Sequence, residues 1–156
     1  MITIRSTTDV PHTKGDQICE FLLNSTDARY QRWWPGTHLA LHTIRSAPNH
    51  IGAVVYMDEL VGNRRIKMLG VVTEAAPGRR ITWQLKKMVC LPVRVSLDLS
   101  DNHHGVTVTH TIRAGFSGVG ILLDPILRLY FSPDFRKSLD EHVKVEFAKL
   151  GEILTE

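Results

Sequence analysis

The sequence predicts an α+β domain in which an antiparallel sheet packs against a long C-terminal helix. Two patterns lead to this expectation. From position 38 to 116, apolar and polar residues alternate with a period of two, and short turn clusters interrupt the alternation. Helical spacing of apolar residues is confined to the two ends of the chain. A length of 156 residues suits one compact unit, so we expect a single domain over residues 1–156.

The N-terminal part is expected to form one strand and two helices. Residues 2–10 begin with apolar and polar residues in alternation, which indicates a short strand. Thr13 followed by Asp16 three positions later is typical of a capped helix start. A second, shorter helix is expected to begin near Thr26 and to end at Pro35-Gly36, because proline cannot continue a helix.

The central part is expected to form about six strands, which makes about seven with the first. In residues 53–60 both faces carry apolar side chains, so either face is able to point inward. Short turns between consecutive strands favour an antiparallel meander. The expected turns lie at Pro48-Asn49, Gly62-Asn63, Pro77-Gly78, Leu91-Pro92 and Asp101-Asn102.

The last element is expected to be a long amphipathic helix. Ser132-Pro133-Asp134 combines a capping hydroxyl, a proline at the first position and an acid in the first turn. Apolar residues then recur every three or four positions and form a stripe that must be covered, which places the helix against the sheet. The stripe consists of Phe135, Leu139, Val143, Phe147, Leu150 and Leu154.

Composition and charge exclude several classes of protein. The net charge of +3 comes from basic pairs scattered along the chain, without a nucleic-acid-binding motif, so we expect no nucleic-acid partner. The longest apolar stretch, residues 118–127, is interrupted by Asp124 and Pro125, and even when extended to Phe131 it is shorter than the ~20 residues of a membrane-spanning helix. The first ten residues lack a signal peptide, and Cys19 and Cys90 provide no disulfide framework, so we expect a cytoplasmic protein.

Several short phrases resemble a known family. Trp33-Trp34-Pro35-Gly36, residues 74–83 and Gly115 to Leu123 are similar to the polyketide cyclase/dehydrase and lipid-transport family of the START-like, or SRPBCC, superfamily. The resemblance implies a helix-grip fold, in which a curved sheet of about seven strands wraps around the C-terminal helix, with two short helices after the first strand. It also implies an internal cavity for a hydrophobic small molecule such as a lipid, a polyketide or an aromatic metabolite.

Three polar residues on otherwise apolar faces are candidate functional groups. His110 lies in the inward row of the last strand, Glu146 lies about 20° from Leu139 on a helical wheel, and His142 flanks the same stripe. One interpretation gives Glu146 a raised pKa and makes a histidine its acid/base partner. A second gives all three a role in orienting a ligand, and a third makes them core residues with hydrogen-bond partners.

The remaining candidate ligand-binding residues are apolar or aromatic. We expect the pair Trp33-Trp34 to form a cap near the mouth of the cavity implied by the resemblance and the others to form its walls, although core residues have the same appearance in a sequence. These candidates are Trp34, Met68, Trp83, Leu97, Phe116 and Val143.

The sequence predicts no metal and no cofactor. His38 and His42 are four positions apart on an expected strand and should therefore share one face, and the chain has eight histidines. No cysteine or carboxylate spacing completes a ligand set, so the expected role is that of exposed strand and turn residues.

Three functions follow as hypotheses. The first is transport or sequestration of a hydrophobic small molecule in the cavity. The second is a cyclase, aromatase or dehydratase that uses the histidines and Glu146 as acid and base. The third is a surface interaction module with a filled core. All three remain open, because one fold can serve several unrelated functions.

Overall fold

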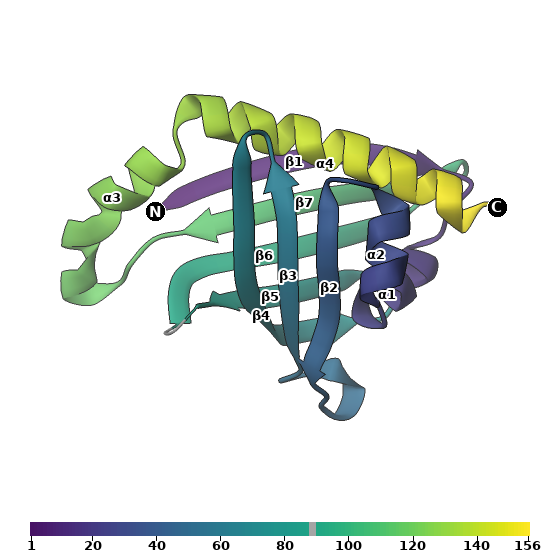
Figure 1. Cartoon of the computed structure of the whole chain (residues 1–156), viewed down its shortest axis with the longest axis horizontal. Coiled ribbons are helices and arrows are strands. Elements are labelled where there is room, and N and C mark those ends of the chain that lie inside the picture. Colours follow the sequence, from purple (N-terminus) through teal and green to yellow (C-terminus); the bar gives the residue numbers. More distant parts are fainter. Residues whose placement is uncertain (88–89) are drawn as a thin grey trace.

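A computed structural model, which describes residues 1–87 and 90–156, shows one antiparallel sheet that spans most of the chain (Figure 1). Its strands are ordered β1-β7-β6-β5-β4-β3-β2, so every neighbour except β1 follows directly in sequence. This confirms the predicted meander of seven strands. The strands are β1 Ile2–Pro11, β2 His38–Arg45, β3 Val54–Val61, β4 Arg64–Ala76, β5 Arg80–Lys86, β6 Cys90–Asp101 and β7 Gly105–Ala114.

The turn expected at Leu91-Pro92 is wrong, because both residues lie within β6. The side-chain amide of Gln84 donates to the Leu91 carbonyl at 2.5 Å, and the Gly115 N–H donates to the Pro92 carbonyl at 2.9 Å. Proline lacks an N–H but keeps its carbonyl, so it is tolerated at the beginning of a strand.

Two short helices follow β1, as predicted: α1 spans Gly15–Leu23 and α2 spans Asp27–Trp33. Thr26 caps α2 through its hydroxyl, which accepts the Arg29 N–H. Thr13 does not cap α1. Its hydroxyl is turned back to the Pro11 carbonyl, and Lys14 is the N-cap residue instead.

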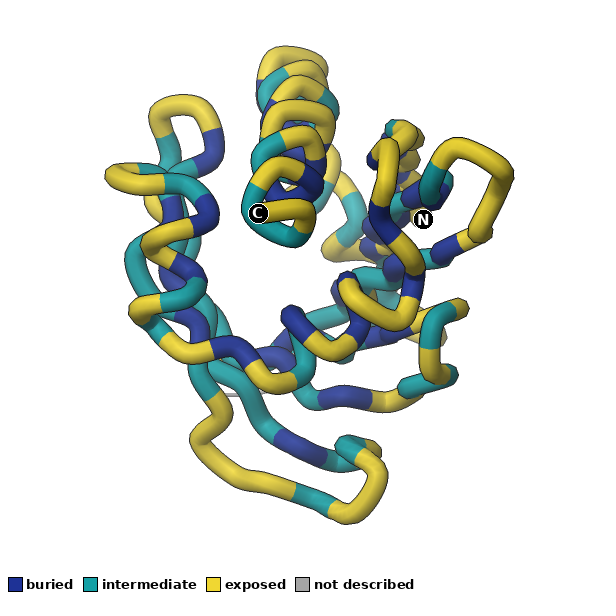
Figure 2. Tube along the Cα trace, turned by 90° about the vertical axis from the view of Figure 1, so that its right-hand side faces the viewer, coloured by how far each residue is buried: buried dark blue, intermediate teal, exposed yellow. Residues whose placement is uncertain are grey.

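The C-terminal helix α4, Pro133–Leu154, lies across the open side of the curved sheet (Figure 2). Ser132 caps it by accepting the Phe135 N–H at 3.3 Å, as expected. Its apolar stripe is buried from Phe135 to Leu150. Val143, Phe147 and Leu150 form a core with buried valines of β1 and β7, so helix and sheet cover each other.

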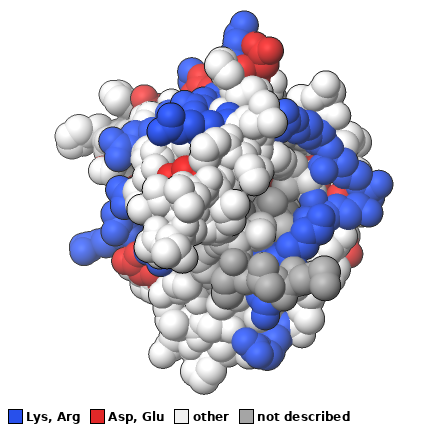
Figure 3. Space-filling view, turned by 90° about the vertical axis from the view of Figure 1, so that its left-hand side faces the viewer, with Lys and Arg blue, Asp and Glu red and all other residues white. Residues whose placement is uncertain are grey.

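Two further helical segments precede α4: the 3-10 helix η2, Gly118–Leu123, and α3, Asp124–Tyr130. The Asp124 carboxylate holds them by accepting the Phe116 N–H at 2.9 Å. Several apolar side chains here are exposed, including Val119 and Leu122. Figure 3 views the molecule from this end, where Lys and Arg side chains surround uncharged surface. Among the described residues, no helix has the length and apolar character needed to cross a bilayer.

Candidate functional site

A cavity of about 170 Å³ lies between the concave face of the sheet and α4. Its walls are mostly apolar. Strands β3 to β7 and helix α4 supply most of them, and α1, α2, β2 and the end of α3 supply the rest. The side chains of the sheet and of α4 do not fill the space between them, so this volume stays open.

The structure places the candidate residues in two groups. Those that line the cavity are Met68, Trp83, Leu97, His110, His142 and Glu146. Trp34, Phe116 and Val143 are described but are not part of the lining. Trp34 instead stacks on the ring of His142, with 4.8 Å between ring centres, Val143 is buried in the core, and Phe116 lies in the segment before η2.

One end of the cavity is polar. His142 and Glu146 lie one turn apart on α4, and two residues of the sheet meet them: His38 at the beginning of β2 and Glu59 in β3. We call these four residues the polar cluster. His38 Nε2 lies 3.3 Å from Glu146 Oε1, and His142 Nε2 lies 3.7 Å from Glu59 Oε2.

Aromatic residues of α2 hold the polar cluster from behind. The Tyr30 hydroxyl donates to Glu59 Oε2 at 2.7 Å, and the Tyr30 ring stacks on His38 with 3.9 Å between ring centres. Trp33 Nε1 donates to the backbone carbonyl of Glu146 at 2.6 Å. These contacts fix both walls of the polar end relative to each other.

The electrostatics of the cluster couple His142 to Glu59. Burial lowers the pKa of His142, but the carboxylates of Glu59 and Glu146 outweigh it and raise this pKa above its ordinary value. Burial likewise raises the pKa of Glu59, but His142, Tyr30 and His38 outweigh it and lower this pKa. The pair is therefore stabilised as imidazolium and carboxylate.

His110 is chemically separate from this cluster. Burial is the main cause that lowers its pKa, and the carboxylates of Glu146 and Glu59 only partly oppose the effect. The structure thus brings two of the three predicted polar residues together and leaves His110 as a neutral group on the sheet wall.

A β-bulge explains how His38 reaches the polar cluster. In the pairing of β2 with β3, His38 faces Glu59 and Ala40 faces Asp58, so Leu39 is an extra residue. The bulge places His38 on the same side of the sheet as Leu41, which borders the cavity. His38 is fully buried as a result.

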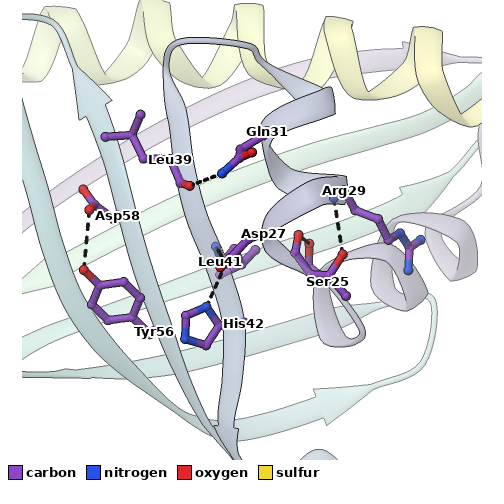
Figure 4. Close-up of polar contacts among 10 residues, drawn as sticks. Ser25, Asp27, Arg29, Gln31, Leu39, Leu41, His42, Tyr56 and Asp58 are labelled. Atoms are coloured by element: carbon purple, nitrogen blue, oxygen red, sulfur yellow. Dashed lines mark hydrogen bonds and ion pairs between the residues drawn. The ribbon is translucent and has the colours of Figure 1, made fainter.

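The expectation that His38 and His42 share one face is therefore wrong. His42 lies beyond the bulge, is partly exposed and contacts Asp27 of α2, with 2.7 Å between Nδ1 and Oδ1 (Figure 4). Helix α2 also binds the bulge, because the Gln31 amide donates to the Leu39 carbonyl at 2.8 Å.

No protein-family model and no curated protein matches the sequence. Solved structures do resemble this one. The solution structure of the KanY protein has a TM-score of 0.67 at 10% identity, and the match covers 99% of this chain and 98% of that chain. TTHA0849 from Thermus thermophilus has a TM-score of 0.64 at 11% identity, covering 99% of this chain and 97% of that one. Ara h 8.0201 has a TM-score of 0.61 at 9% identity, and the match covers 99% of this chain and 97% of that chain. At these identities the likeness establishes the fold alone, which is the helix-grip fold.

Proposed function

We propose that this START-like helix-grip domain binds a small hydrophobic molecule inside its cavity and carries or sequesters it. The observation that supports this most directly is the largely apolar cavity of about 170 Å³ between sheet and helix. An engineered apolar cavity of about 150 Å³ stays free of water and accepts benzene. A ligand with one or two rings therefore fits this cavity, so its size favours an aromatic metabolite over a long-chain lipid. An open interior also argues against the interaction module with a filled core.

The physical basis of binding is the removal of apolar ligand surface from water, at roughly 25 cal/mol per Å². A few polar groups at one end of an apolar pocket set the orientation of a ligand. The polar end here contains Glu59, His142 and Glu146. We therefore expect the ligand to carry a polar substituent that is directed toward these side chains.

A titration with 2-naphthol tests this proposal. A ligand that binds only the folded state stabilises it by about 2.7 kcal/mol at 100 times its Kd. For a chain of this size, that corresponds to a rise in Tm of about 5–10 °C. The ring current of the naphthol should also shift the methyl resonances of Met68 and Leu97, which line the cavity.

Two tryptophan substitutions on β6 give a matched comparison. Val95 lines the cavity and its neighbour Arg94 is exposed on the other face of the sheet. Val95→Trp should fill the volume and abolish the Tm shift, whereas Arg94→Trp should leave it intact. The absence of both the Tm shift and the methyl shifts in the wild-type protein would overturn the proposal.

The polar cluster supports a second candidate function, an acid/base enzyme of the cyclase or dehydratase class. His142 has a raised pKa and faces the cavity beside two carboxylates. Glu146→Ala distinguishes the two functions. A carrier should lose only modest affinity for 2-naphthol, whereas an enzyme should lose turnover of a poly-β-ketone thioester by ~100-fold or more. Chromatography of the cyclised product measures that turnover.

A further inference from the structure

We propose that the polar cluster binds one divalent transition-metal cation, for which Zn²⁺ is the probe. His38, Glu59, His142 and Glu146 each offer one ligand atom, and these atoms all lie within 4.8 Å of one another. Two imidazoles and two carboxylates form a ligand set that suits zinc and its neighbours in the first transition row. The sequence alone predicted no metal, because the ligands come from three separate elements.

The distances within the cluster are close to those of a metal site. Zinc binds nitrogen and oxygen at about 2.0–2.2 Å, which places neighbouring ligand atoms of a tetrahedron about 3.3–3.6 Å apart. Here His38 Nε2 lies 3.3 Å from Glu146 Oε1 and 4.0 Å from Glu59 Oε2. His142 Nε2 lies 3.7 Å from Glu59 Oε2 and 4.0 Å from the other oxygen of Glu146, Oε2. These four distances exceed the tetrahedral separation by at most about 0.7 Å, and the most widely separated ligand atoms, which lie within 4.8 Å of each other, would have to approach by about 1.2–1.5 Å to close around a cation.

The histidines lack the partners that buried polar atoms normally have. His38 is 0% exposed, and within the described part of the chain neither of its ring nitrogens makes a hydrogen bond. The same is true of His142 Nε2. Most buried polar atoms in proteins have a hydrogen-bond partner. A cation between the two Nε2 atoms and the carboxylates would be the missing partner of both rings.

The surroundings match those of a metal site in two further ways. Glu59 and Glu146 place two carboxylates in a largely buried space, and a divalent cation would balance both charges. Residues behind the ligands fix their orientation: Tyr30 holds Glu59 by a 2.7 Å hydrogen bond and stacks on His38, and Trp34 stacks on His142. Such supporting contacts are typical of metal sites.

Calorimetric titration of the chelator-treated protein with ZnCl₂ tests the proposal. We expect one Zn²⁺ per chain and a Kd in the micromolar range or tighter. Glu146→Gln preserves the shape of the side chain but removes a ligand charge, so affinity should fall at least 10-fold. His42→Ala serves as the matched control, because His42 lies on the same strand but faces away from the cluster.

A Co²⁺ titration provides a readout that does not depend on the variants. Four-coordinate Co²⁺ ligated by the cluster should give intense visible absorption that Zn²⁺ displaces at one equivalent. Absence of stoichiometric binding in the wild-type protein would overturn the proposal. So would binding that Glu146→Gln leaves unchanged and His42→Ala removes. Binding of 2-naphthol to the chelated protein is measured separately, so failure of the metal site and failure of the cavity proposal are distinguishable.

Discussion

The hydrogen bond from Tyr30 to Glu59 should be among the strongest single polar contacts in this chain. It is 2.7 Å long, Tyr30 is 2% exposed, and the acceptor is a carboxylate. Hydrogen bonds to charged groups contribute about 1.5–3 kcal/mol, and a buried acceptor that loses its donor keeps its desolvation penalty. Tyr30→Phe removes the hydroxyl and preserves the ring that stacks on His38. We therefore expect the free energy of unfolding to fall by about 2 kcal/mol.

Urea denaturation of the chelator-treated protein measures this loss. With a slope of about 2 kcal/mol/M, the midpoint should move down by ~1 M without a change in slope. Tyr56→Phe is the matched control. Its hydroxyl donates to Asp58 at 3.4 Å, and Arg65 already binds that carboxylate through two nitrogens. The control should therefore lose less than about 0.5 kcal/mol.

The comparison between the two variants shows whether the hydrogen bond from Tyr30 to Glu59 stabilises the fold. If Tyr30→Phe loses no more stability than Tyr56→Phe, the short bond to Glu59 does not stabilise the fold. The description of α2 as the support of the polar cluster would then be wrong. A change in slope without a change in midpoint would instead indicate an altered unfolded state.

Three further predictions concern the rest of the fold. Gly105→Ala should destabilise the protein by at least ~3 kcal/mol in urea, because its Cβ would lie 2.1 Å from the Val10 carbonyl oxygen; wild-type stability would contradict this close approach. Arg65 holds the pKa of Asp58 below its usual range, so the ion pair stabilises the fold above about pH 4, and this stabilisation is lost as the pH falls through the depressed pKa. Asp58→Asn should therefore weaken the dependence of the free energy of unfolding on pH in the acid range. An ordinary Asp58 pKa, measured by NMR, would refute this prediction. Burial raises the pKa of the Cys19 thiol, so iodoacetamide should modify it only on unfolding, and rapid alkylation in native buffer, detected by peptide mass spectrometry, would be the contrary result.

Local patterns were sufficient to predict the scaffold. The cap at Ser132 and the apolar stripe of α4 are determined by residues within a few positions of one another, and both are confirmed. The same holds for the meander, because alternation and turn residues are local signals. The helical wheel also placed His142 and Glu146 beside the apolar stripe, and the structure locates both in the wall of the cavity.

Other features depend on contacts that a single strand or helix does not reveal. His38 reaches the cluster through a bulge that exists only in the pairing of β2 with β3. Glu59 lies in a strand with apolar residues on both faces, so alternation did not indicate its direction. The N-cap residue of α1 is Lys14 and not the predicted Thr13, because the Thr13 hydroxyl turns back to the end of β1. Tertiary contacts decided each of these cases.

The extra residue Leu39 makes the chemistry of the interior depend on strand phase. If Leu39 were taken into the ladder without a bulge, strict alternation back from Leu41 would turn the imidazole of His38 to the other face of the sheet, while α4 kept its two polar groups. Deletion of Leu39 would not have this effect, because His38 would then stand two positions before Leu41 and keep its direction. The phase of one edge strand therefore sets how many imidazoles the interior holds, and a local change of hydrogen bonding, with no change of amino acid, would be enough to alter that number.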